Sequence, residues 1–279
     1  METRAGGKYN VTQPVLEAFS IEMEYVNART GRRVLAIDEF NVAVEPQQFV
    51  TIVGPSGCGK STFLKIADGL LDPTGGRVTI HGEDVKTARR NRGTVFQDAS
   101  LLPWFTVLAN AAYGLQCQGV PRDEAKERAL PVLEMVGLTG FEDSYPHELS
   151  GGMQQRVNVA RALAIDPEIL LMDEPFASLD AQTRELMQGE LLDIWQQANK
   201  TVLFVTHQID EAVFLSDRVL VMSARPGRLI ADIDIDIPRP RQLRIKRDPK
   251  FVELTAQVWD LLHAEPSIDP SSEAADYDD

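Results

Sequence analysis

Apolar and polar positions follow two different rhythms along this chain. Short, almost wholly apolar runs rich in β-branched residues occupy positions 49–53, 169–172, 201–206 and 218–222, and longer stretches with helical spacing separate them. Continuous apolar runs are typical of strands that helices cover on both faces. The pattern therefore predicts an α/β core, in which a largely parallel sheet is covered by helices.

An earlier group of runs, at positions 21–25, 34–44 and 77–81, has a different character. These runs are separated by turns that contain glycine rather than by helical stretches. Neighbouring strands joined in this way pair in antiparallel fashion. We therefore expect a small antiparallel β layer beside the main sheet.

The strand signal disappears between about 98 and 148, and helical patterning replaces it. We expect a helical subdomain over about 98–165, with one helix starting at Pro121 and carrying Asp123 and Glu124 in its first turn, where acidic side chains suit the helix dipole. Pro131 falls inside this helix and removes a backbone hydrogen bond. A bend or break near 129–130 is therefore predicted.

A final helix is expected near the C-terminus, capped by Asp248 and Pro249. Its apolar stripe consists of Phe251, Leu254, Val258 and Leu261. After Ala264 the chain carries six acidic residues and no basic one, with too little apolar surface to order itself. We expect one domain over 15–263, followed by an acidic disordered tail over 264–279.

Composition narrows the class of protein. Acidic residues outnumber basic ones by 42 to 28 among 279 residues, giving a net charge of −14, which argues against nucleic acid as a partner. Apolar runs fall far short of the roughly 20 residues that cross a bilayer, and the N-terminus lacks the apolar stretch of a secretory signal. Cys58 and Cys117 form no disulfide framework. We expect a reduced, cytoplasmic protein.

A phosphate-binding motif follows the first core strand. The segment GPSGCGKS matches the pattern G-x-x-x-x-G-K-[ST]. The expected nucleotide-binding residues are its members Gly54, Pro55, Ser56, Gly57, Cys58, Gly59, Lys60 and Ser61, and the Thr62 that follows. Backbone N–H groups would curl around the phosphates, Lys60 would reach the β and γ oxygens, and the Ser61 hydroxyl would bind Mg²⁺. The same N–H groups and Lys60 are expected to lower the pKa of the Cys58 thiol and make it an alkylation site that ATP protects.

Two carboxylates end the strand at 169–172. Asp173 and Glu174 emerge at the carboxyl edge of the sheet, where α/β folds bind their ligands. By itself this is a weak signal, which a solvated loop would also produce. After a phosphate loop it predicts that Asp173 holds Mg²⁺ through water and that Glu174 deprotonates the attacking water.

The segment LSGGMQQR, at 149–156, identifies the family. Ser150, Gly151 and Gly152 precede a helix, so bare N–H groups and a positive helix end face outward as a second phosphate clamp. Here the sequence resembles the ABC ATPase family, whose signature is LSGGQ, with Met153 at the usual Gln position. The resemblance spans about 21–227. It implies a P-loop NTPase core with an antiparallel β subdomain and an inserted helical signature subdomain, the cofactors ATP and Mg²⁺, and a second ATPase subunit, either an identical copy or a close paralogue.

The resemblance implies roles for four further residues. Tyr25 resembles the aromatic residue that stacks on adenine, although a core tyrosine is the alternative. Gln97 resembles the loop glutamine that contacts Mg²⁺ or the lytic water, and His207 resembles the switch histidine that contacts the γ-phosphate. Asp180 resembles an acid that crosses to the opposing subunit; an ordinary helix N-cap is the alternative, and both can hold.

The finer resemblance is to the ATP-binding subunits of nitrate, sulfonate and taurine importers. It rests on LLPWFTV at 101–107, the signature segment, PFASLDAQTRE and SARPGR. It implies transmembrane permease subunits docking near 101–107, an indirect link to a periplasmic or extracellular solute-binding protein, and a peripheral position on the cytoplasmic face of the cell membrane. The LLPWFTV segment is alternatively a buried hinge, and a soluble ABC ATPase of iron–sulfur cluster assembly is the alternative function. A P-loop kinase would have no use for the signature helix.

Overall fold

The computed structural model describes residues 13–86 and 92–264, and the predicted acidic tail after Ala264 lies outside them. A six-stranded sheet forms the core, in the order β10-β9-β3-β8-β7-β6. Its strands are β3 (Phe49–Val53), β6 (Arg92–Val95), β7 (Ile169–Asp173), β8 (Thr201–Thr206), β9 (Arg218–Met222) and β10 (Leu229–Asp234). All neighbours pair in parallel except β9 and β10, which are antiparallel. The predicted parallel core is therefore confirmed.

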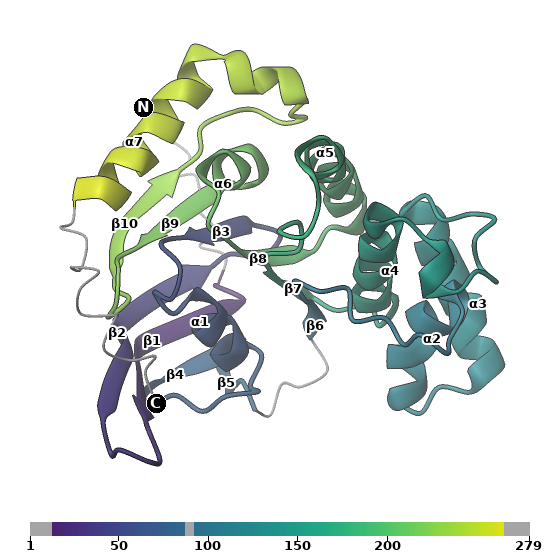
Figure 1. The fold of residues 1–279 in the computed structure, drawn as a ribbon, viewed down its shortest axis with the longest axis horizontal. Helices are drawn as coiled ribbons and strands as arrows, with labels where there is room; N and C mark the ends of the chain where they lie inside the picture. The colour runs from purple at the N-terminus through teal and green to yellow at the C-terminus, as the bar shows by residue number, and fades with distance from the viewer. Residues whose placement is uncertain (1–12, 87–91, 265–279) are drawn as a thin grey trace, which may run out of the picture.

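The second sheet is the expected antiparallel β layer. It is ordered β2-β1-β4-β5 and consists of β1 (Leu16–Val26), β2 (Arg33–Val44), β4 (Gly75–Ile80) and β5 (Glu83–Asp84). Helix α1 (Lys60–Ala67) lies between the two sheets (Figure 1). Its Phe63 ring packs 4.6 Å from that of Phe40 on β2, and both are fully buried. This apolar layer fixes α1, and with it the loop before α1, to both sheets.

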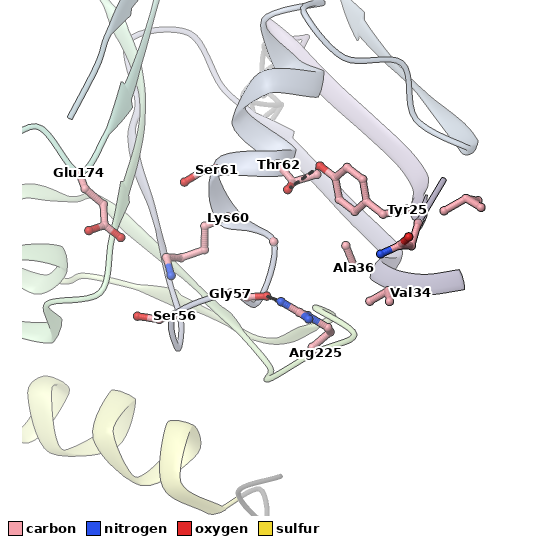
Figure 2. A pocket seen from close by; sticks show the side chains of 13 residues that line it. Tyr25, Val34, Ala36, Ser56, Gly57, Lys60, Ser61, Thr62, Glu174 and Arg225 are labelled. Carbon is pink, nitrogen blue, oxygen red and sulfur yellow. Dashed lines mark hydrogen bonds between the residues drawn. The ribbon is translucent and has the colours of Figure 1, made fainter. Parts of the chain in front are cut away.

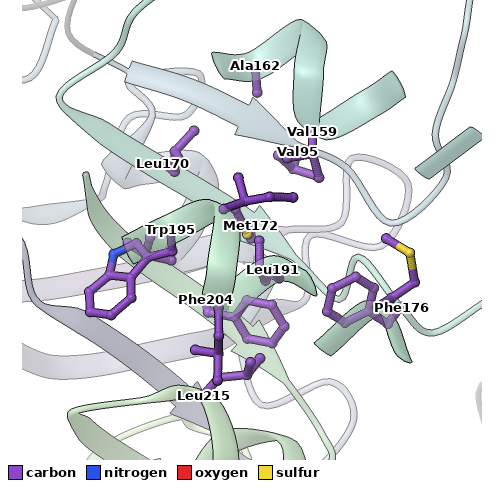
Figure 3. Packing of buried hydrophobic residues seen from close by; sticks show 14 of the residues in the cluster. Val95, Val159, Ala162, Leu170, Met172, Phe176, Leu191, Trp195, Phe204 and Leu215 are labelled. Atoms are coloured by element: carbon purple, nitrogen blue, oxygen red, sulfur yellow. The ribbon is translucent and has the colours of Figure 1, made fainter. Parts of the chain in front are cut away.

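Helices α5 (Ala181–Ala198) and α6 (Ile209–Leu215) cover the other face of the core sheet. Helices α2 (Val107–Cys117), α3 (Arg122–Met135) and α4 (Gly151–Ala164) pack on one another, and α4 contacts β6. Figure 3 shows Met172 and Phe204 of the sheet facing Leu191 and Trp195 of α5. Figure 1 shows α2, α3 and α4 gathered at one end of the molecule, beyond β6 and β7. No described residue between Phe96 and Glu168 belongs to a strand, in agreement with the helical patterning of that part of the sequence.

Helix α3 is not divided near 129–130, because it runs unbroken from Arg122 to Met135 with Pro131 inside it, and the expected bend there stays a prediction. Pro131 lies on the exposed side of the helix, so the carbonyl of Glu127 that it leaves unbonded can be satisfied by water. Ala129 and Leu133 on the opposite side are buried in the core. Packing of that stripe holds the helix together across the proline.

After β10 the described chain continues in a strap, residues 235–248, and a helix, both of which pack on α6. The strap includes the short helix η3 (Leu243–Arg247), and α7 (Pro249–Ala264) buries Phe251, Leu254 and Val258 as predicted. Arg241 fastens the strap, since its buried guanidinium donates hydrogen bonds to the carbonyls of Val213, Phe214 and Ser216. Burial lowers the pKa of Arg241 to about 10. No helix among residues 13–86 and 92–264 has the length and hydropathy needed to cross a membrane.

Candidate functional site

The phosphate loop connects β3 to α1 at the carboxyl edge of the core sheet. It curls around Lys60, whose buried ammonium donates to the carbonyls of Gly54 and Pro55, both at 2.9 Å. Gly57 and Gly59 adopt left-handed backbone angles, with φ of 74° and 105°. A Cβ on Gly59 would also lie 2.8 Å from the Ile37 side chain, so both backbone angle and space require glycine there.

The prediction of a reactive Cys58 thiolate is wrong. The Cys58 side chain is 1% exposed and packs with the apolar cluster between the two sheets. Burial raises the pKa of the Cys58 thiol, and this outweighs the opposing effect of Lys60. Cys58 is therefore a buried packing residue whose backbone alone belongs to the loop.

A hydroxyl and a carboxylate meet beside the loop. The Ser61 hydroxyl, in the first turn of α1, donates to Oδ1 of Asp173 at 2.7 Å. Asp173 ends β7, and burial raises its pKa while the hydrogen bond from Ser61 opposes that effect. Within the described residues no group of three or more His, Cys, Asp or Glu side chains converges as a metal site. One carboxylate with one hydroxyl suits Mg²⁺, which takes few protein ligands and completes its octahedron with water and substrate phosphates.

A second pair of predicted residues meets one step further along the same edge. Nδ1 of His207 lies 2.8 Å from Oε2 of Glu174. Glu174 follows β7 and His207 follows β8, which are parallel neighbours, so the two strands deliver both side chains to one place. Glu174 has a left-handed φ of 42°, and its N–H is bonded to the carbonyl of Val205. The Glu174 carboxylate is thus fixed at both its backbone and its side chain.

A cavity of about 590 Å³ extends from this edge toward the β layer. Lys60, Ser61 and Glu174 line it, and Tyr25 of β1 lines its other end (Figure 2). Tyr25 is 44% exposed, and its hydroxyl lies 3.2 Å from that of Thr62. It is therefore not a core tyrosine. Val34 and Ala36 of β2 provide an apolar wall beside it.

Arg225 also lines the cavity, and the sequence analysis did not single it out. It lies in the turn between β9 and β10, and its Nε and Nη2 atoms are each 3.3 Å from the carbonyl oxygen of Gly57. The segment SARPGR was noticed only as part of a resemblance. The sequence did offer one signal for Arg225: it follows β9, and β9 pairs with β3, the strand that leads into the phosphate loop.

The signature residues lie apart from this cavity. Ser150 caps α4 by accepting a hydrogen bond from the N–H of Met153, and Gly151 beside it is exposed. Figure 1 places α4 on the far side of β7 and β8 from α1. Ser150, Gly151 and Gly152 are absent from the cavity lining. Within one chain the two expected phosphate clamps therefore do not meet.

Asp180 and Gln97 occupy exposed positions. Asp180 caps α5 by accepting from the N–H groups of Gln182 and Thr183, both at 3.1 Å. The hydrogen bond from Thr183 lowers the pKa of the Asp180 carboxyl. The N-cap interpretation therefore holds, and the exposed carboxylate leaves a second role open. Gln97 follows β6, the neighbour of β7, so it emerges at the same edge as Asp173.

Comparisons with known proteins identify the family. The ABC transporter family model matches residues 37–177. An uncharacterized ABC transporter ATP-binding protein of Methanocaldococcus jannaschii is 53% identical over 235 residues, covering 84% of this chain and 87% of that protein. The taurine import ATP-binding protein TauB of Rhizobium johnstonii is 48% identical over 242 residues, covering 85% of this chain and 92% of that protein.

A solved structure agrees with these relatives. The dimeric post-hydrolysis state of the ATP-binding cassette MJ0796, bound to ADP and phosphate, matches with a TM-score of 0.69 and 32% identity. The match covers 80% of this chain and 100% of that one. Fold and site therefore define an ATP-binding cassette with ATPase chemistry. The chain belongs to the ABC transporter family.

Proposed function

We propose that this protein is the ATP-hydrolysing subunit of an ABC importer of the nitrate, sulfonate and taurine type. The observation that carries the proposal is the convergence of Lys60, the Ser61–Asp173 pair and the Glu174–His207 pair at one sheet edge, beside a cavity that ends at Tyr25. In this arrangement Lys60 would bind phosphate, the Ser61–Asp173 pair would bind a cation, and Glu174 would act as the base. Tyr25 would then stack on the adenine.

The residues act on ATP in distinct ways. Tyr25 stacks on the adenine, and the backbone N–H groups of 54–62 and the Lys60 ammonium bind the phosphates. Glu174 accepts the proton of the attacking water as the water's oxygen forms its bond to the γ-phosphorus and the bond to ADP breaks. His207 holds the Glu174 carboxylate in line and donates to the γ-phosphate.

Magnesium fits the same site. Ser61, Asp173 and Gln97 would hold the ion, directly or through water, and when bound it neutralises the negative charge that develops on the β and γ oxygens. Burial raises the pKa of Asp173, and a bound cation would offset the cost of the buried negative charge. Because only one of these three side chains is a carboxylate, phosphate oxygens and water could fill the remaining coordination positions of the ion.

A second subunit is required to complete the site. Ser150 and Gly151 are exposed at the start of α4, with the buried Gly152 after them, on a surface that the chain's own cavity does not reach. Two copies, or this chain and a close paralogue, would place each signature helix against the other's phosphate loop and trap ATP between them. The exposed side chain of Asp180, at the start of α5, would contact the opposing subunit across the same interface. The dimeric state of the matched cassette supports this arrangement.

The membrane partner would dock on the segment after Gln97. Asn110 clamps that segment, since its amide donates to the carbonyls of Leu102 and Phe105 and its oxygen accepts from the N–H of Leu102. Trp104 projects from the clamped turn and is 67% exposed. An exposed tryptophan on a rigid turn is suited to an interface and not to a buried hinge. Permease subunits there would place the protein on the cytoplasmic face of the membrane, with the solute-binding protein reached through the permease.

The test has two parts that address the enzyme and the importer separately. Mg-ATP hydrolysis is measured for the parent and for Lys60→Ala, which removes the phosphate-binding ammonium, and EDTA is added as a second control. Co-purification with a multi-spanning membrane protein then tests the importer. Absence of ATP hydrolysis that depends on Lys60 would refute the ATPase assignment. Hydrolysis without any permease partner would favour a soluble ABC ATPase instead.

A further inference from the structure

The turn between β9 and β10 is clamped against the phosphate loop. The N–H of Gly227 donates to the carbonyl of Ala36 at 2.9 Å, and its carbonyl accepts from the N–H of Asp38 at 3.1 Å. A Cβ on Gly227 would lie 2.0 Å from the carbonyl oxygen of Cys58, so only glycine allows this approach. The turn is therefore held between β2 and the phosphate loop by backbone contacts.

Arg225 projects from this fixed turn into the nucleotide cavity. Its Nε and Nη2 atoms share one acceptor, the Gly57 carbonyl, and its Nη1 atom has no hydrogen-bond partner within residues 13–86 and 92–264. The side chain is exposed and lines the cavity together with Tyr25. Figure 2 shows Arg225 and Tyr25 on one side of Lys60, with Glu174 on the other.

We propose that Arg225 binds the nucleoside half of ATP. The proposal rests on the ATP site proposed above and adds a binding residue to it. The phosphate end of the cavity is occupied by Lys60, Ser61 and Glu174, so the guanidinium faces the part of the ligand that lies between Lys60 and Tyr25. That part carries the ribose hydroxyls and the adenine ring nitrogens, which accept hydrogen bonds. A guanidinium offers planar donors to such acceptors and also stacks on an aromatic base.

The fixed turn makes the contact favourable. A long side chain normally loses rotamer freedom when it binds a ligand, and part of that loss has already occurred where Gly57 orients the guanidinium.

The Gly57 contact also allows a competing explanation, in which Arg225 supports only the shape of the phosphate loop. The two explanations differ in the ligands they affect, because a loop defect weakens every phosphate ligand and a nucleoside contact does not.

The experiment compares Mg-ATP with Mg-tripolyphosphate, which has the phosphates and lacks the nucleoside. Dissociation constants are measured by calorimetry for the full chain, for Arg225→Ala and for Arg225→Lys. We expect Arg225→Ala to weaken ATP about tenfold, as for one or two lost hydrogen bonds, and to leave tripolyphosphate within about twofold of the parent. Arg225→Lys, which keeps the charge and loses the planar donors, is expected to fall between them.

Arg228→Ala is the matched control, because Arg228 lies in the same turn and binds Asp38 on β2. It loosens the turn without removing the side chain that lines the cavity. Its effect on the two ligands should be equal. The proposal is overturned by unchanged ATP affinity in Arg225→Ala, by equal losses for both ligands, or by the same ATP-selective loss in Arg228→Ala. A parent chain that binds neither ligand would refute the proposed ATP site itself, which is a distinguishable result.

Discussion

Nδ1 of His207 and Oε2 of Glu174 lie 2.8 Å apart, although the two residues are 33 positions apart in the chain. The contact exists because β7 and β8 pair in parallel and end together. His207→Ala should leave the Glu174 carboxylate free to turn away from the lytic water. We expect ATP hydrolysis at saturating ATP to fall by about 10²-fold or more, with a much smaller loss of ATP affinity, because His207 provides only one of several phosphate contacts. Steady-state hydrolysis and nucleotide binding check this, and a hydrolysis rate near that of the parent would contradict it.

Tyr25 contributes to ATP affinity through its ring more than through its hydroxyl. Stacking a base on an aromatic ring is worth about 1–3 kcal/mol, whereas the hydroxyl makes one exposed contact with Thr62 at 3.2 Å. We expect Tyr25→Ala to weaken ATP binding by about tenfold or more and Tyr25→Phe to change it by less than about threefold. Equal losses in the two variants, measured by calorimetry, would show that the hydroxyl matters more than stacking.

Glu211 makes stability depend on pH. It is 3% exposed, and burial raises the pKa of its carboxyl, opposed by hydrogen bonds from Thr206 and Gln188 and by the charges of Arg184 and His207. A raised pKa means that the folded state keeps the proton after the unfolded state has lost it. The free energy of unfolding therefore decreases as pH rises from the ordinary glutamate pKa to the raised one, by at most about 1.4 kcal/mol per pH unit.

Glu211→Gln removes that titration and keeps the size of the side chain. Relative to the parent, the variant should become more stable as pH is raised from the ordinary glutamate pKa toward neutrality, and urea unfolding at several pH values measures the difference. All other groups are the same in both proteins, so their contributions cancel to first order. Parallel stability curves for the parent and the variant would show that Glu211 keeps an ordinary pKa.

Trp104 tests the docking surface. Because it is 67% exposed, Trp104→Ser should leave the melting temperature of the isolated subunit within about 2 °C of the parent. Co-purification with the permease should fall. Trp259→Ser on α7 is the matched control, since Trp259 is 55% exposed and lies on another part of the surface. A large drop in melting temperature, or equal loss of partner in both variants, would count against docking at Trp104.

The residues predicted most accurately from the sequence are those placed by local motifs and sheet order. Lys60 and Ser61 follow from one contiguous motif after one strand. Asp173 ends a core strand, and Glu174 and His207 each directly follow one, all at the same carboxyl edge of the sheet. A parallel sheet brings such residues together whatever the rest of the fold does. Their proximity therefore follows from the order of strands and motifs along the chain.

The errors and omissions arose where tertiary packing decides the outcome. Whether Cys58 faces the phosphates or the core depends on the apolar layer beneath the loop, which no local pattern reports. Pro131 is tolerated because it lies on the exposed side of α3. Arg225 reaches the cavity because Gly227 pairs with β2, a contact between segments about 190 positions apart. The periodicity of apolar residues does not predict such contacts between distant segments.

Glu174→Gln tests the central claim, that this cassette hydrolyses ATP between two subunits with Glu174 as the base. The amide keeps the size and the hydrogen bonding of the side chain and cannot accept the proton. We expect hydrolysis to fall by about 10²-fold or more.

The decisive measurement is the molar mass of Glu174→Gln in solution, by size-exclusion chromatography with light scattering, with and without Mg-ATP. The account predicts a dimer of cassettes that forms only with ATP and retains it, because binding is intact and hydrolysis no longer separates the subunits. A monomer at saturating ATP together with hydrolysis near the parent rate would contradict the account.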